Sequence, residues 1–176
     1  MLDLVSIILI GISLSMDTFS LSLSLSSIIN YKYMKIIPLS VGMFHFFMPL
    51  FGNIIGINII KIFNIVNDLV LGIILVLLGI DLLINFFKKE DITIKLSLIG
   101  VLLFSLSVSI DSFSVGIGIN NITNSYYVAA LIFAIISCLF TFLGLFLGKY
   151  LNKIIGKYAL LFGSFLLIIL GLFYIF

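Results

Sequence analysis

Six long apolar stretches, separated by short polar connections, set the pattern of this chain. A transmembrane helix needs about 20 consecutive and mainly apolar residues, and each stretch is about that long. The pattern therefore predicts an all-α polytopic membrane protein with a single transmembrane domain over residues 1–176. The six predicted transmembrane helices are Leu4–Ile29, Ile36–Ile60, Leu69–Phe87, Leu96–Asn120, Tyr126–Gly148 and Tyr158–Phe176.

Two acidic residues interrupt this apolar pattern near the middle of a predicted helix. Asp17 lies in the first helix and Asp111 in the fourth, each among serines and apolar residues. A carboxylate at bilayer depth costs about 2.5–3.5 kcal/mol on insertion scales. Helix packing does not require a carboxylate, so we interpret both residues as functional.

Serines share a helix face with each aspartate. Spacings of four, three and four residues place Ser13, Asp17, Ser20 and Ser24 on one face, and the fourth helix has the same arrangement around Asp111. Such a stripe is expected to face the interior of the bundle and not lipid. For the serines alone we favour a packing role, because small residues enrich helix interfaces.

The two halves of the chain are related in sequence. Asp17 and Asp111 are 94 residues apart, and the pair Gly52 and Gly56 recurs 92 residues later as Gly144 and Gly148. Each half holds three predicted helices, so the second copy would cross the membrane in the opposite sense. We predict two inverted-topology repeats, at 1–90 and 95–176, with the site at their interface near the midplane.

Charge sets the expected orientation in the membrane. Hydrophobic residues make up 63% of the chain and charged residues 9%, which is typical of a membrane protein. Lys61 is the only lysine expected on one side, and the positive-inside rule places the opposite side in the cytoplasm. We therefore expect a multi-pass protein of the bacterial plasma membrane with both termini outside. The lysines on the expected cytoplasmic side are Lys32, Lys35, Lys88, Lys89, Lys95, Lys149, Lys153 and Lys157.

The paired acids favour a divalent cation as ligand. Two carboxylates about 5 Å apart repel by about 3 kcal/mol at an effective dielectric of 20, and a doubly charged ion would remove that cost. Carboxylate and hydroxyl oxygens suit Mg²⁺, Ca²⁺ or Mn²⁺, whereas soft metals would require more than one Cys and one His. Alongside Asp17 and Asp111, the predicted lining hydroxyls are Thr18, Ser20, Ser112 and Ser114.

His45 is a further candidate in the second predicted helix. Pro49 lies four residues later and cannot donate a hydrogen bond to the His45 carbonyl, which leaves a backbone oxygen beside the imidazole. His45 could be a nitrogen ligand, a proton carrier or a hydrogen-bonded core residue. Asp81, in the third helix, could form a cytoplasmic vestibule or pair with Lys88 or Lys89.

These motifs resemble the bacterial manganese efflux pumps of the lysine exporter superfamily. The resemblance covers nearly the whole chain. It implies a six-helix inner-membrane exporter of Mn²⁺, with Asp17 and Asp111 at the positions of the family's essential aspartates. The family also contains a sporulation-associated branch. The matching motifs are Ser15-Met16-Asp17-x-Phe19, Ser109-x-Asp111-x-x-x-Val115-Gly116-x-Gly118, Pro49-Leu50-x-Gly52, Leu143-Gly144-x-x-x-Gly148-Lys149 and Ile155-Gly156-Lys157-x-Ala159.

We predict a secondary transporter that exports Mn²⁺ or a similar hard divalent cation through a two-aspartate site. The alternatives are a transporter of another cation or a cationic metabolite, or a non-transport membrane protein of sporulation. An intramembrane hydrolase is disfavoured, because no Gly-x-Ser-x-Gly motif is present. We expect no enzymatic activity, no cofactor beyond the transported ion and no nucleic-acid partner; a homo-oligomer is left open.

Overall fold

The computed structural model describes residues 2–26, 29, 32–63, 67–87, 98–148 and 154–175. Each predicted transmembrane stretch is helical, and the chain is an all-α polytopic membrane protein. The helices are α1 (Leu2–Leu25), α2 (Tyr33–Phe63), α3 (Asn67–Phe87), α4 (Leu98–Ser107), α5 (Ile110–Gly118), the short 3₁₀ helix η1 (Ile119–Asn121), α6 (Tyr126–Leu147) and α7 (Ile154–Ile175).

The fourth predicted helix differs from the expectation. We expected one continuous helix at Leu96–Asn120, but the structure has α4 and α5 with Val108 and Ser109 between them. A hydropathy pattern cannot reveal such a break, because the break leaves the run of apolar residues intact. At the break, serine side chains donate hydrogen bonds to nearby backbone carbonyls, and these bonds are described with the site.

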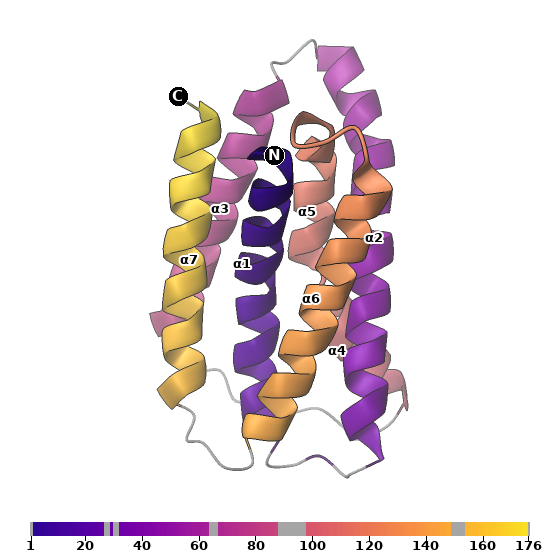
Figure 1. The fold of residues 1–176 in the computed structure, drawn as a ribbon, viewed down its shortest axis with the longest axis vertical. Coiled ribbons are helices and arrows are strands. Elements are labelled where there is room, and N and C mark those ends of the chain that lie inside the picture. Colours follow the sequence, from indigo (N-terminus) through magenta and orange to yellow (C-terminus); the bar gives the residue numbers. More distant parts are fainter. Residues whose placement is uncertain are drawn as a thin grey trace.

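The helices form one upright bundle in which α1 occupies the centre (Figure 1). α1 packs against α6 and α7, α2 packs against α6 and the α4–α5 span, and α3 packs against α7. α1 and α6 run in the same direction, whereas α2 and the α4–α5 span run in the other (Figure 1). Helix pairs far apart in sequence therefore form the main contacts of the bundle.

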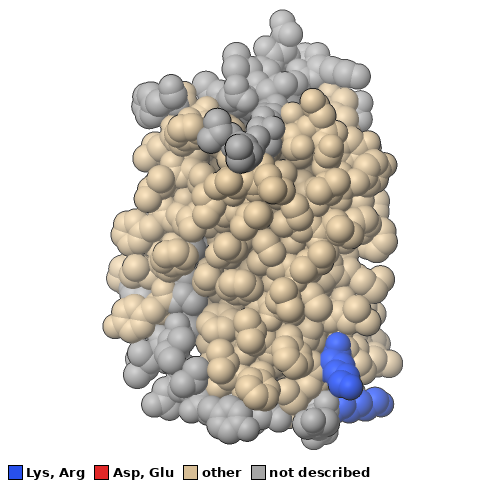
Figure 2. All heavy atoms as spheres, viewed as in Figure 1, with Lys and Arg blue, Asp and Glu red and all other residues tan. Residues whose placement is uncertain are grey.

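The outside of the bundle is suited to lipid. Within the described residues, four stretches are long and apolar enough to cross a bilayer. The described atoms on the face in Figure 2 are uncharged except for lysine atoms at the lower end. Lys32 and Lys35 are both exposed at the beginning of α2. The four stretches are Leu4–Leu23, Tyr33–Ile57, Leu98–Gly118 and Tyr126–Leu147.

Buried apolar residues form two separate clusters. The first apolar cluster gathers around Ile10, Leu14 and Phe133, toward the end of the bundle where α1 begins. The second gathers around Leu25 and Leu145, toward the opposite end. The two clusters therefore lie toward opposite ends of the bundle, and the buried residues between them are polar.

Candidate ion-binding site

A layer of buried polar residues lies between the two apolar clusters. In α6, Phe133 belongs to the first cluster and Leu145 to the second, and Ser137 and Thr141 lie between them. Along α1 and along the α4–α5 span, buried polar residues likewise lie between a residue of one apolar cluster and a residue of the other. We call these residues the polar layer; each is at most 1% exposed. Its members are Ser15, Thr18, His45, Ser109, Ser112, Ser137 and Thr141.

In the predicted polar stripe of α1, Ser13 and Ser20 are buried, whereas in the matching stripe around Asp111 the side chain of Ser107 is exposed and does not face the interior as expected. Ser13 and Ser15 are fully buried and donate hydrogen bonds to the carbonyls of Leu9 and Gly11, at 2.8 and 2.7 Å. The Ser15 Oγ also lies 3.0 Å from the Ser137 Oγ of α6. This hydroxyl pair joins α1 to α6 at the depth of the polar layer. Asp17 follows two residues later and is partly buried.

Replacing Ser15 with alanine removes the bond to Ser137 and is expected to have a small effect. Interhelical hydrogen bonds within a membrane average about 0.6 kcal/mol, because polar groups in the unfolded state also find partners. We expect a slightly lower thermal midpoint in detergent and unchanged transport. A large loss of transport from Ser15→Ala, with normal amounts of protein in the membrane, would give the hydroxyl a direct role in ion binding.

The break between α4 and α5 comes immediately before Asp111. Ser109 has φ −109° and ψ 1°, and its amide donates to the Leu106 carbonyl three residues back, at 3.2 Å. The Ser109 side chain donates to the same carbonyl at 3.0 Å, and the Ser112 side chain donates to the Ser109 carbonyl at 2.7 Å. Serine side chains compete in this way with regular helical hydrogen bonds.

The break places Asp111 in the first turn of α5. The Ser112 amide donates to the Asp111 carboxylate at 2.7 Å. A carboxylate is favoured at this position, because the first amides of a helix have no partner within it and the helix dipole is positive there. Discontinuous helices with charged or polar groups at the break are typical of ion sites in secondary transporters. The run of serines before Asp111 does not by itself predict the break, because Ser13 and Ser15 precede Asp17 in the same way and α1 is continuous.

The four predicted lining hydroxyls differ in their surroundings. Thr18 and Ser112 are fully buried, Ser20 is 9% exposed, and Ser114 is only partly buried. The Thr18 Oγ1 is buried and has no hydrogen-bond partner among the described residues, whereas the Ser114 Oγ lies 3.4 Å from the Ile110 carbonyl. Thr18 is therefore the member of this set with a buried oxygen still available to a ligand.

His45 is fully buried within α2, which continues unbroken through Pro49. Its Nδ1 lies 3.0 Å from the Val41 carbonyl oxygen. Its Nε2 is buried and has no partner among the described residues. His45 is therefore a hydrogen-bonded core residue through Nδ1, with a backbone carbonyl in place of the expected hydroxyl as its partner, and Nε2 remains available.

Glycines allow two helix pairs to cross at close range. A Cβ atom at Gly52 or Gly56 of α2 would overlap the carbonyl oxygens of Phe113 and Ile117 in α5. A Cβ atom at Gly144 of α6 would lie 2.7 Å from the Phe19 carbonyl oxygen of α1. Phe19 and Phe113 each lie two residues after one of the aspartates. The glycine pairs therefore hold α2 and α6 against the two helices that carry the aspartates.

Asn53, a possible amide ligand on sequence grounds, forms an amide pair beside one crossing. The Asn120 Nδ2 donates to the Asn53 Oδ1 at 2.6 Å, and Asn53 is 3% exposed. This bond joins α2 to η1 near the end of the bundle where both finish. A buried asparagine in an apolar span was the available signal, but its partner is 67 residues away in sequence.

The structure leaves part of the predicted site untested. Within the described part of the chain, no three His, Cys, Asp or Glu side chains form a group that could hold a metal. A metal shell here would include hydroxyl, amide, backbone or water oxygens. A shared ion between Asp17 and Asp111 stays a prediction. The side chain of Asp81 lies outside the described residues.

Comparisons with known proteins agree on one family. The family described as "Putative manganese efflux pump" matches residues 28–175. A protein of that name from Bacillus pumilus is 32% identical over 97% of this chain and 94% of its own length. Another, from Oceanobacillus iheyensis, is 33% identical over 99% of this chain and 97% of its own length. No solved structure matches the chain.

Proposed function

The chain belongs to the putative manganese efflux pump family, and on this premise we propose that it exports Mn²⁺ from the cytoplasm as a secondary transporter. Asp17 and Asp111 are the proposed metal ligands. His45 and the lining hydroxyls of Thr18, Ser20, Ser112 and Ser114 complete the proposed site. The bacterial plasma membrane is the proposed location, with both termini outside.

The polar layer is the observation that carries this proposal. Buried polar side chains are costly in a membrane protein and mark ion or substrate pathways when they face the bundle interior. Here they lie between two apolar clusters, at intermediate depth, on the two helices that carry the aspartates and on α2 and α6, which pack against them. An ion held at that depth would be separated from water on both sides, as alternating access requires.

Matching contacts in the two halves support an inverted repeat as the moving parts. Gly52 approaches the carbonyl of Phe113, and Gly144 approaches the carbonyl of Phe19. Gly144 follows Gly52 by 92 residues and Phe113 follows Phe19 by 94 residues, so each contact has its counterpart in the other half of the chain. One crossing lies toward the end of the bundle where α2 and α5 finish, and the other toward the end where α1 and α6 finish. Rocking of the repeats would loosen one crossing while the other stays closed.

Uptake of Mn²⁺ by inside-out membrane vesicles tests the proposal directly. Vesicles that contain the protein should accumulate Mn²⁺ faster than vesicles without it, because export from the cell becomes uptake in this orientation. An imposed pH gradient should change the rate if protons exchange for the metal. Equal Mn²⁺ uptake with and without the protein, at verified abundance and with either gradient, would contradict manganese export.

A further inference from the structure

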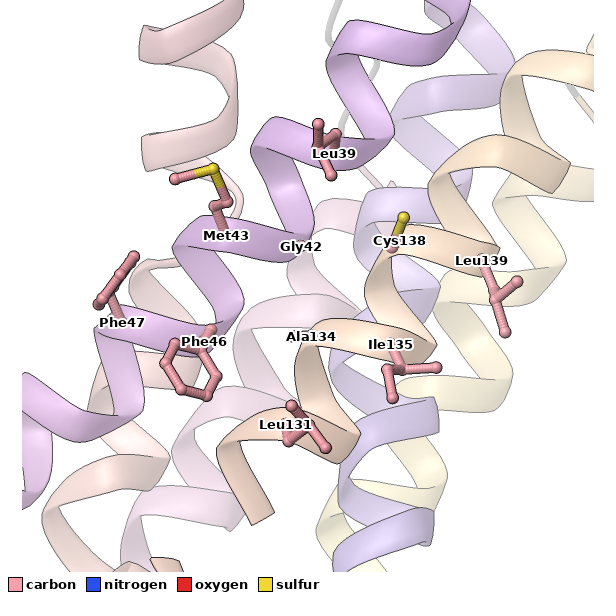
Figure 3. Close-up of a pocket in the computed structure, with 10 residues that line it drawn as sticks. All are labelled: Leu39, Gly42, Met43, Phe46, Phe47, Leu131, Ala134, Ile135, Cys138 and Leu139. Atoms are coloured by element: carbon pink, nitrogen blue, oxygen red, sulfur yellow. The ribbon is translucent and has the colours of Figure 1, made fainter. Parts of the chain in front are cut away.

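An apolar groove lies on the outside of the bundle between α2 and α6 (Figure 3). Its volume is about 530 Å³, and it is lined by apolar residues and Cys138. Sites for small organic ligands commonly enclose about 300–1,000 Å³, so the groove is large enough to hold one. The exposed residues of its walls are Leu39, Met43 and Phe47 of α2 and Leu131, Ile135 and Leu139 of α6.

Small residues form the floor of the groove, where the two helices touch. A Cβ atom at Gly42 of α2 would lie 3.1 Å from the Ala134 carbonyl oxygen and 3.1 Å from the Cys138 Cβ of α6. Ser137, the neighbour of Cys138 in sequence, is buried and bonded to Ser15 in the polar layer. The helix contact therefore separates the groove from the polar layer, and the groove faces the lipid side.

Two lysines lie at the end of the groove where α2 begins. Lys35, Leu39, Met43 and Phe46 are spaced by four, four and three residues, so they share one face of α2. Lys32 immediately precedes the first residue of α2, and both lysines are exposed. Figure 2 shows lysine atoms at the lower end of the molecule, where α2 begins in Figure 1. The groove thus has a positively charged end and an apolar length.

The length of the groove matches one leaflet of a bilayer. At a rise of 1.5 Å per residue, Phe46 lies about 16 Å along α2 from Lys35. The hydrocarbon core of a bilayer is about 30 Å thick, so one leaflet contributes about 15 Å. With Lys35 at the level of the headgroups, Phe46 lies near the midplane. An acyl chain of that leaflet would run along the groove while its headgroup lies beside the lysines.

We propose that the groove, with Lys32 and Lys35, is a binding site for one anionic phospholipid such as phosphatidylglycerol. Lysines at the membrane surface attract anionic headgroups, and basic pockets between transmembrane helices bind them. The acyl chain packs against the apolar walls and the headgroup phosphate pairs with the lysines. A zwitterionic lipid has the same chain but no net charge, so it gains less from the lysines.

Charge argues against a second copy of this chain as the occupant. In a two-fold symmetric dimer the same patch of each copy meets the other, so groove would face groove. With both copies in the same orientation in the membrane, the two pairs of lysines would meet at one end of the interface, where like charges repel. An anionic headgroup supplies the opposite charge at that place.

Fluorescence quenching by brominated lipids tests the proposal. The chain contains no tryptophan, so Phe46→Trp places a single indole in the groove. The variant is reconstituted in bilayers of equal phosphatidylglycerol and phosphatidylcholine, with bromine on the chains of one lipid or of the other. Phosphatidylglycerol should bind with about fivefold or greater relative affinity, since each lysine near the surface favours an anionic headgroup by about that factor. Phe47→Trp reports on the same groove if Phe46→Trp does not fold.

A tryptophan outside the groove is the matched control. Phe165 is 53% exposed on α7, which packs against α1 and α3, so Phe165→Trp should be quenched equally by the two lipids. In the Phe46→Trp background, replacing Lys32 and Lys35 together with glutamine should remove the preference for phosphatidylglycerol. Replacing both with arginine keeps the charge and should retain it.

Three results would overturn the proposal. Equal quenching of Phe46→Trp by the two lipids would show that the groove does not select an anionic lipid. A preference that survives the double glutamine substitution would show that the lysines do not set it. Little quenching by either lipid, with normal quenching of Phe165→Trp, would show that a second copy covers the groove.

Discussion

Replacing Asp111 with asparagine is expected to abolish manganese export. Asparagine keeps the size of the side chain and its ability to accept the Ser112 amide hydrogen bond, but it removes the negative charge that a divalent ion requires. Loss of a group that only supports a metal ligand costs about 10- to 100-fold in affinity, so loss of a charged ligand should cost at least as much. Asp17→Asn should have the same effect.

Growth of an exporter-deficient bacterial strain on manganese measures this loss, together with retention of radioactive Mn²⁺ by the cells. Asp91→Asn makes the same chemical change in the connection between α3 and α4 and should retain resistance. Immunoblots of membranes show whether each variant is inserted. Wild-type resistance in the double variant Asp17→Asn and Asp111→Asn, at normal abundance, would refute the two-aspartate site.

The second large effect is expected from alanine at Gly56. Alanine normally stabilises a helix by up to about 1 kcal/mol relative to glycine. Here its Cβ would overlap the Ile117 carbonyl oxygen and lie 2.7 Å from the Ile117 Cα, and these backbone atoms cannot turn aside. α2 and α5 would have to separate, and overpacking of this kind costs about 1–3 kcal/mol or more. We expect a marked fall in thermal stability and loss of transport.

Size-exclusion chromatography of a fluorescent fusion after heating measures the stability of this variant in detergent. Gly11→Ala is the matched control, because its Cβ would meet only side-chain carbons of Ile136 and Phe133, at 3.0 and 3.1 Å. Those side chains can shift by small rotations, so its effect should be much smaller. Equal midpoints for Gly56→Ala and wild type would show that the α2–α5 crossing is looser than described.

The sequence predicts the helices of this protein better than it predicts their contacts. Hydropathy locates every transmembrane stretch, because each must present apolar residues to lipid. It does not predict the break at Ser109, because the break lies within an apolar run and the similar serines before Asp17 lie in a continuous helix. Helical spacing correctly places Ser13 and Ser20 inside the bundle, since both are buried.

The partners within the candidate site could not be predicted in the same way. The Ser15–Ser137 and Asn53–Asn120 pairs join residues far apart in sequence, so they depend on how the helices pack. The free nitrogen of His45 depends on a hydrogen bond to Val41, which sequence spacing permits but does not require. Sequence indicates candidate residues for the chemistry, and packing decides which of their atoms remain available.

The two apolar clusters also bear on how the cell keeps its ion gradients. A bare ion crossing dry protein faces a solvation penalty of several kcal/mol or more, so each cluster acts as an electrical insulator. Phe133 in one cluster and Leu145 in the other are both fully buried, so an ion leaving the polar layer in either direction would meet such apolar packing. Packing of this kind limits ion leak, so many copies of the protein in one membrane would leave the cell's ion gradients intact.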